Sequence, residues 1–315
     1  MVKHLFSVRH RLRVVLLFVF VAAFGGTAAP LRAQAEIVQT RTEPASIADL
    51  ANEIRQYRAR GELNVALAKA KHLVDLVERQ EGQSGANYAQ ALSLQGTVLY
   101  ELGQYSEAEP LFRRALALNT KVRGEKHPDT IISLINLAVS FDRQGRYAES
   151  EPIRRRALAL RTEVLGEKHP DTISSLNNLA SSLNELGRAA EAEPLYRRAL
   201  ALSTEVLGEK HPVTISILAN LANNLDSLGR YAEAEPLYRR ALALNTEVRG
   251  EKHPDTISNL NNLAGDLDGL GRYAEAEPLY RRALALRTEV LGEKDRKSTR
   301  LNSSHLRLSR MPSSA

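Results

Sequence analysis

Cysteine and tryptophan are absent from this 315-residue chain, and aromatic residues make up only 5% of it. Without cysteine the chain can form no disulfide, no thiolate metal site, no cysteine nucleophile and no cysteine-linked lipid anchor. A sequence that is poor in aromatic residues and rich in alanine and leucine favours helices over sheets. The composition therefore predicts an all-α protein.

Excess positive charge is confined to the two ends of the sequence. The whole chain has 43 Lys and Arg residues against 37 Asp and Glu residues. Five basic residues lie within 1–35, and five more lie within 295–315 together with one acid, which leaves 33 basic and 36 acidic residues between the ends. Because this central part has a net charge of −3, the basic total gives no reason to expect a nucleic-acid partner.

The first 35 residues have the order typical of a secretory signal peptide. A basic stretch precedes an apolar run over 14–24, and the small-residue triplet Ala-Gln-Ala occupies 33–35. The apolar run is too short to span a bilayer comfortably, so we expect cleavage after the triplet and a mature chain that begins at Glu36. The protein would then be exported to the periplasm or secreted, with 36–42 as a short linker. The alternative is a segment that is kept as a membrane anchor.

The last 21 residues, 295–315, show no apolar periodicity and begin with the string DRKSTRLNSSH. This string resembles the translation of an adapter oligonucleotide used in DNA sequencing. We therefore expect an artefactual, disordered tail that takes no part in the fold.

Between the two ends the sequence repeats every 42 residues. One glycine recurs at this spacing without exception, at Gly61, Gly103, Gly145, Gly187, Gly229 and Gly271. The string GEKHP recurs at the same spacing from Gly124, Gly166, Gly208 and Gly250. The period divides the chain into six units, 43–84, 85–126, 127–168, 169–210, 211–252 and 253–294. Self-similarity of this kind is the signature of a solenoid.

Each unit has the pattern of two helices. In the fourth unit, apolar residues recur at three- and four-residue steps along a first helix: Ile173, Leu176, Leu179, Ala180, Leu183 and Leu186. Pro170 suits the first helical position, and Gly187 suits the left-handed residue that ends the helix. The inner face of the second helix is predicted to carry Ala192, Leu195, Tyr196, Ala199, Leu202 and Val206.

The run HPDTISSLNNLASSLNELGRAAEAEPLYRRALAL, residues 169–202, resembles a tetratricopeptide repeat of the 42-residue, kinesin-light-chain-like type. The likeness covers 85–294 strongly and 43–84 weakly. It implies a right-handed superhelical solenoid of about six antiparallel helix pairs, with the first helix of each pair on the concave wall. One departure falls in the third unit, where we expect Ile153 to replace the aromatic ring found at Phe112, Tyr196 and Tyr238.

The candidate binding residues are asparagines of the first helices. The resemblance implies that polar residues on this wall meet ligands, and four asparagines recur two residues before the small mid-helix alanine: Asn136, Asn178, Asn220 and Asn262. An amide offers both donors and an acceptor, so such a row suits the backbone of an extended peptide. Further polar residues are expected on the same wall: Asn177, Asn261, Asn184, Asn223, Asp142, Asp226 and Asp268. The alternative is that each asparagine bonds the neighbouring unit and fixes the stacking.

Other candidate sites point to structure rather than chemistry. One histidine per unit, at His127, His169, His211 and His253, is too widely spaced for tetrahedral zinc and is predicted to be a turn residue. The Arg pairs of the second helices follow glutamates, as Glu193 precedes Arg197, which predicts a solvated outer face. No phosphate loop or nucleophile motif occurs, so we expect no metal, no cofactor and no catalysis.

These observations predict an exported scaffold whose concave groove binds a protein or an extended peptide. The alternative is the N-terminal regulatory half of a longer enzyme, such as a caspase-like protease or a signalling protein, truncated after Lys294. The sixth unit, 253–294, keeps the internal apolar pattern without polar replacement, so we also expect self-association through this uncapped repeat. Neither a nucleic acid nor a membrane beyond the signal segment is expected as a partner.

Overall fold

The fold was analysed in a computed structural model, which describes residues 46–291. These residues form twelve α-helices and no strand, as the composition and the repeat predict. The helices are α1 (Ile47–Ala59), α2 (Leu63–Glu81), α3 (Ala86–Glu101), α4 (Tyr105–Arg123), α5 (Pro128–Arg143), α6 (Tyr147–Leu165), α7 (Pro170–Glu185), α8 (Ala189–Leu207), α9 (Pro212–Ser227), α10 (Tyr231–Arg249), α11 (Pro254–Gly269) and α12 (Tyr273–Leu291). The chain is therefore an all-α repeat solenoid.

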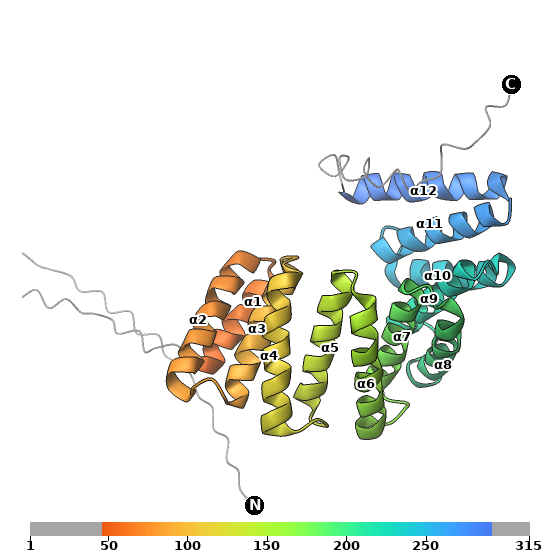
Figure 1. Ribbon diagram of the computed structural model, residues 1–315. Helices are drawn as coiled ribbons and strands as arrows, with labels where there is room; N and C mark the ends of the chain where they lie inside the picture. The colour runs from red at the N-terminus through yellow and green to blue at the C-terminus, as the bar shows by residue number, and fades with distance from the viewer. Residues whose placement is uncertain (1–45, 292–315) are drawn as a thin grey trace, which may run out of the picture. The chain divides into compact units, whose positions relative to one another are not determined.

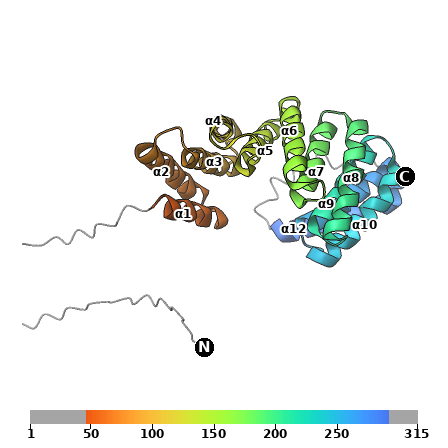
Figure 2. The same ribbon diagram turned by 90° about the horizontal axis from the view of Figure 1, so that it is seen from below.

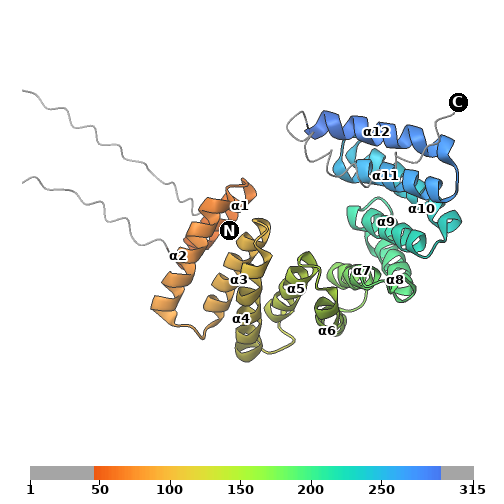
Figure 3. The same ribbon diagram turned by 45° about the horizontal axis from the view of Figure 1, so that its top comes forward.

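Every helix packs against the helix before it and the helix after it, so the pairs follow one another in chain order (Figure 1). The odd-numbered helices also contact one another across the units: α7 contacts α9, α9 contacts α11, and α3 contacts α1 and α5. No two even-numbered helices within the described range approach each other as extensively. The odd-numbered helices therefore form one continuous layer on the inner side of the row, and the even-numbered helices form the outer layer (Figures 2 and 3).

The predicted apolar stripes form the core, with two exceptions: Leu186 lies one residue past the end of α7 and is half-buried, and Val206 lies near the end of α8. Along α7 the residues Ile173, Leu176, Leu179, Ala180 and Leu183 are buried. On α8 the stripe ends earlier than predicted, because Val206 is 41% exposed. The cause is length: α8 has 19 residues and its antiparallel partner α7 has 16, so the last turn of α8 has no facing helix. The assignment of Val206 to the inner face was wrong.

The helix boundaries follow from local chemistry. Pro170 occupies the first position of α7, where the missing N–H removes no helical hydrogen bond. Gly187 follows the end of α7 with φ of +73°, a conformation that side chains with a Cβ rarely adopt. The glycine recurs in all six units and the proline in the last four, so the same start and stop are repeated from α5 onward.

Several predicted segments lie outside the described residues. These are the signal segment 1–35, the linker 36–42, and the tail 295–315. None of the helices described between Ile47 and Leu291 is long and apolar enough to cross a membrane.

Candidate functional site

The four asparagines of the predicted row stand at the same position of four stacked helices. Asn136, Asn178, Asn220 and Asn262 are each the ninth residue of their helix, in α5, α7, α9 and α11. All four side chains are half-buried. Because α7 contacts α9 and α9 contacts α11, the equivalent positions lie side by side on the inner layer. The row is therefore a feature of one face, built from several units.

Hydrogen bonds join part of this row across the unit boundary. The Nδ2 atom of Asn220 in α9 donates to Asn177 Oδ1 in α7 over 2.9 Å. Asn177 Nδ2 in turn donates to Asn178 Oδ1 over 3.3 Å. This chain of amides contributes to stacking, as the alternative interpretation expects. Among the described residues, no group forms a hydrogen bond with Asn178 Nδ2 or with Asn220 Oδ1. One amide donor and one amide acceptor are therefore left for a ligand.

The remaining predicted asparagines divide into two groups. Asn223 accepts a hydrogen bond from the Tyr238 hydroxyl over 2.7 Å, and Asn184 accepts one from Asn224 over 3.0 Å. These two side chains are engaged within the protein. Asn136, Asn261 and Asn262 make no side-chain hydrogen bond within residues 46–291, so their amides are available on the inner layer.

Asn224 is a residue that the sequence analysis missed. It is fully buried, and its Nδ2 atom donates both to Asn184 Oδ1 and to the Ala189 carbonyl, over 3.0 and 2.9 Å. The side chain thereby joins the fifth unit to the fourth. A signal was present in the sequence, because a polar residue recurs at this position within the buried stripe: Ser140, Ser182, Asn224 and Asp266.

The third unit contains an ion pair where the second, fourth, fifth and sixth units have an aromatic ring. The residue 42 positions after Phe112 is Arg154 and not Ile153, so the predicted replacement was off by one residue. Arg154 is only 8% exposed, and its Nε atom donates to Asp142 Oδ2 over 2.9 Å and to Ser150 Oγ over 3.2 Å. Asp142, expected on the open wall, is therefore neutralised inside the protein.

Asp226 occupies the position equivalent to Asp142 two units later and has no ion pair within the described chain. It is half-buried, and burial raises the pKa of its carboxyl above the ordinary value. Asp268, one unit further on, is also half-buried. The inner layer of the last units thus presents amides and acids without a facing cation.

The four turn histidines are helix caps. The His169 Nδ1 atom accepts a hydrogen bond from the backbone N–H of Asp171 over 3.1 Å, and His127, His211 and His253 repeat this contact. Within residues 46–291 no group of three or more His, Asp or Glu side chains is placed to hold a metal ion. The structural role of these histidines is therefore to cap the first turn of a helix by accepting one backbone hydrogen bond.

The arginines of the outer layer are paired with glutamates, as predicted. Arg197 contacts Glu193 within α8 over 2.8 Å, and Arg198 donates to Glu167 of the preceding turn over 2.7 Å. The hydrogen bond from Arg198 lowers the pKa of the Glu167 carboxyl below its ordinary value. Because these pairs are exposed, they keep the outer face soluble and contribute little stability.

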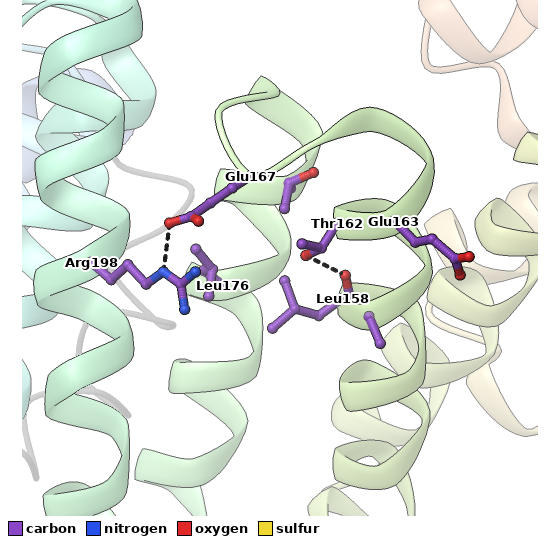
Figure 4. A pocket seen from close by; sticks show the side chains of 8 residues that line it. Leu158, Thr162, Glu163, Glu167, Leu176 and Arg198 are labelled. Atoms are coloured by element: carbon purple, nitrogen blue, oxygen red, sulfur yellow. Dashed lines mark hydrogen bonds and ion pairs between the residues drawn. The ribbon is translucent and has the colours of Figure 1, made fainter.

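A hollow of about 330 Å³ opens between α6 and α8, over the first turns of α7 (Figure 4). Its apolar lining comes mainly from Leu158 and Leu176, and the Arg198–Glu167 hydrogen bond lies at its edge. The hollow lies on the outer side, where neighbouring even-numbered helices stand apart. It is separate from the asparagine row.

The family follows from this architecture and from sequence comparison. The sequence profile of the tetratricopeptide repeat matches residues 46–121, 88–153, 143–188, 173–246 and 227–289. The chain therefore belongs to the tetratricopeptide repeat family. No curated protein matches the sequence.

Solved structures share the fold at low identity. A putative kinesin light chain of Podosopora anserina with nearly identical TPR-like repeats is 22% identical, with a TM-score of 0.57, and the match covers 65% of this chain and 97% of that one. BtubC (BKLC) from P. vanneervenii is 22% identical, with a TM-score of 0.59 and coverage of 79% and 94%. A Rap protein complexed with Competence and Sporulation Factor is 15% identical, with a TM-score of 0.53 and coverage of 78% and 75%. These matches show the solenoid fold.

Proposed function

We propose that the inner layer of odd-numbered helices binds an extended peptide segment of a partner protein. The observation that carries this proposal is the asparagine row, which crosses several units and leaves amide donors and acceptors without partners. An extended peptide has one donor and one acceptor per residue, so amides at a regular spacing match its backbone. The Rap protein solved with Competence and Sporulation Factor shares this fold and supports a binding role.

The pairing of charged side chains differs between the two layers and also favours the inner layer as the binding face. Exposed charges of the outer layer are mostly paired, as Arg230 is with Glu193 and Arg272 is with Glu235, each over 2.7 Å. On the inner layer, Asp226 has no ion pair among the described residues, and the side chains of Asn136, Asn261 and Asn262 make no hydrogen bond there. A partner peptide therefore gains more hydrogen bonds on the inner layer than on the outer one.

We further propose that the protein works outside the cytoplasm. The basic stretch, the short apolar run and the small-residue triplet of residues 1–35 support export. The peptide ligand would then come from a periplasmic or secreted partner.

A random peptide library displayed on phage provides the test. The full chain is panned against the library, and an enriched peptide is titrated by calorimetry. The double variant Asn178→Ala/Asn220→Ala should bind about 5- to 150-fold more weakly, the scale of about 1–3 kcal/mol of lost hydrogen bonds.

The matched control removes two polar side chains from the outer layer of the same units. Arg197→Ala/Arg239→Ala, at side chains that are about half exposed, should leave the affinity unchanged. Equal affinities for the asparagine variant and the unaltered chain, or a loss in the arginine variant alone, would disprove binding by the asparagine row.

A further inference from the structure

Consecutive units meet at a polar contact that recurs in the same register. We call this contact, made by side chains of successive odd-numbered helices, a seam. In the seam between α5 and α7, Ser182 Oγ lies 3.4 Å from Asp142 Oδ1, to which it donates. In the seam between α7 and α9, Asn224 Nδ2 donates to Asn184 Oδ1 over 3.0 Å. Each of these seams has a donor on the later helix and an acceptor on the earlier one.

The seam between α9 and α11 has no such donor. The 42-residue period places Asp226 in the acceptor position and Asp266 in the donor position. Asp266 is fully buried, and both of its carboxylate oxygens lack a hydrogen-bond partner in the described chain. Asn224, its equivalent, also donates to a backbone carbonyl, that of Ala189, which an ionised carboxylate cannot do. The period thus places a second carboxylate where the two preceding seams have a donor.

No neighbouring side chain supplies the missing donor. The titratable and charged groups that face Asp266 come from α9, α10, the turn before α12, and α12: Asp226, Glu235, Tyr238, Arg239, Arg272 and Tyr280. Arg272 contacts Glu235 and Glu275, each over 2.7 Å, and Arg239 contacts Glu235 over 2.8 Å. The Tyr238 hydroxyl donates to Asn223. A buried carboxylate without a donor is strongly unfavourable, so a further hydrogen must be present.

We propose that Asp226 and Asp266 hold one proton between them across the seam of α9 and α11, and that this seam loosens when the proton is lost. The protonated carboxyl of Asp266 takes the role of the Asn224 amide, donating to Asp226 as Asn224 donates to Asn184. The preceding seams use an amide or a serine at this position, so only this seam responds to pH. Because α9 and α11 carry Asn220 and Asn262, the proton links pH to the spacing of the asparagine row.

The direction of the pH effect follows from burial. Burial, with a smaller contribution from the negative charge of Asp226, raises the pKa of Asp266 to about 7 from an ordinary value of 3.8. The folded seam therefore holds its proton between about pH 4 and pH 7, where an exposed aspartate has lost it. The stabilisation is complete below pH 3.8 and is lost as the pH rises through 7.

Hydrogen–deuterium exchange of the full chain, read by mass spectrometry on α11 peptides, tests this proposal. Protection factors corrected for intrinsic exchange are compared between the unaltered chain and Asp266→Asn at pH 5.5 and pH 8.5. Between pH 5.5 and pH 8.5, the protection factors of the unaltered chain should fall about thirtyfold relative to those of Asp266→Asn. The reason is that pH 5.5 lies one and a half units below a pKa of about 7, and pH 8.5 lies above it.

Two further variants keep the test decisive. Asp226→Asn removes the charge opposite Asp266 and supplies a donor to it, so the pH dependence should be smaller than in the unaltered chain. Asp268→Asn, on the same helix but outside the pair, should follow the unaltered chain. Parallel behaviour of Asp266→Asn and the unaltered chain at both pH values would overturn the proposal. So would a loss of protection at pH 5.5 when EDTA removes divalent cations, because a metal ion and not a proton would then occupy the seam.

Discussion

Histidine is an uncommon cap for the first turn of a helix, yet α5, α7, α9 and α11 each begin after one. The imidazole Nδ1 atom accepts a backbone hydrogen bond, as the oxygen of serine or asparagine does at ordinary caps. Proline at the next position removes one of the N–H groups that would otherwise need a partner. The four repeated histidines therefore fix where each inner helix begins.

Replacement of one cap should measure its contribution. His169→Ala leaves the Asp171 N–H without the acceptor that now lies 3.1 Å away, and should lower the free energy of unfolding by roughly 0.5–2 kcal/mol. His169→Asn keeps an acceptor and should restore most of this loss. Urea unfolding followed by circular dichroism gives both values. Equal stability of the alanine and asparagine variants would show that the cap contributes nothing.

The Arg154–Asp142 pair shows how a single position can change the chemistry of a seam. The fourth unit has Tyr196 and Asn184 at the equivalent positions. The third unit thus replaces a ring and an amide by a guanidinium and a carboxylate. In the third unit Asp142 accepts from Arg154, and in the fourth unit Asn184 accepts from Asn224, so each of these side chains has a partner.

A variant pair can test this interdependence. Arg154→Ala leaves Asp142 largely buried without its cation, and should cost about 3–5 kcal/mol of stability. Arg154→Tyr combined with Asp142→Asn recreates the arrangement of the fourth unit and should recover most of the loss. Thermal unfolding of both variants is the measurement. A double variant as unstable as Arg154→Ala would contradict the equivalence of the two units.

At the scale of helices, close packing depends on small residues at the middle of the inner helix. Four units have alanine there, but α3 has Gly96. A Cβ atom at Gly96 would lie 2.8 Å from Phe112 Cε1, which is closer than packed atoms approach. The ring of Phe112 therefore sits closer to α3 than an alanine would permit.

Two glycine substitutions of opposite sign are expected. Gly96→Ala should destabilise the chain by about 1–3 kcal/mol, because α3 and α4 must separate. Gly265→Ala, where the new Cβ atom would lie 3.6 Å from the Tyr280 hydroxyl, has room and should stabilise α11 by about 0.5–1 kcal/mol. Chemical denaturation of the two variants gives the comparison. A stabilising Gly96→Ala would contradict the close contact.

The repeat period was sufficient to predict the elements, but not their contacts. Twelve helices, the proline starts of α5, α7, α9 and α11, and the glycines that follow helix ends are predictable from spacing and local chemistry. The exposure of Val206 could not be predicted, because the periodic pattern continues past the end of the facing helix. The alternative interpretation expected a bond such as that from Asn220 to Asn177, but its partner atom and the bond from Asn224 to Asn184 depend on how neighbouring units are rotated against each other.

At the scale of the whole molecule, stability is shared between neighbouring units. In α12, Leu284 is 39% exposed, whereas its equivalents Leu242 and Leu200 are half-buried and pack against the core. We predict that α11 and α12 exchange amide hydrogens faster than the pair α7 and α8. Hydrogen exchange at pH 6 measures this order, and equal protection of both pairs would contradict it.

The self-association expected from the sixth unit belongs to the same scale. If the exposed face of α12 pairs with another copy, the sedimentation coefficient should rise with protein concentration. Leu284→Gln should then keep the chain monomeric without affecting the fold. A coefficient independent of concentration in the unaltered chain would rule out this association.

Export can be tested on the intact protein. Expressed with its own N-terminus in a Gram-negative host, the chain should appear in the periplasmic fraction with Glu36 as its first residue, as the small-residue triplet at 33–35 predicts. Fractionation followed by intact mass spectrometry reads both properties. An uncleaved chain in the membrane fraction would instead support the anchor.

The most direct test of the proposed binding face is hydrogen–deuterium exchange of the full chain with and without a peptide enriched from the library. The proposal predicts that the peptide increases protection in α5, α7, α9 and α11, around Asn136, Asn178, Asn220 and Asn262. Protection confined to α8 and α10, or to the hollow beside α6, would contradict it.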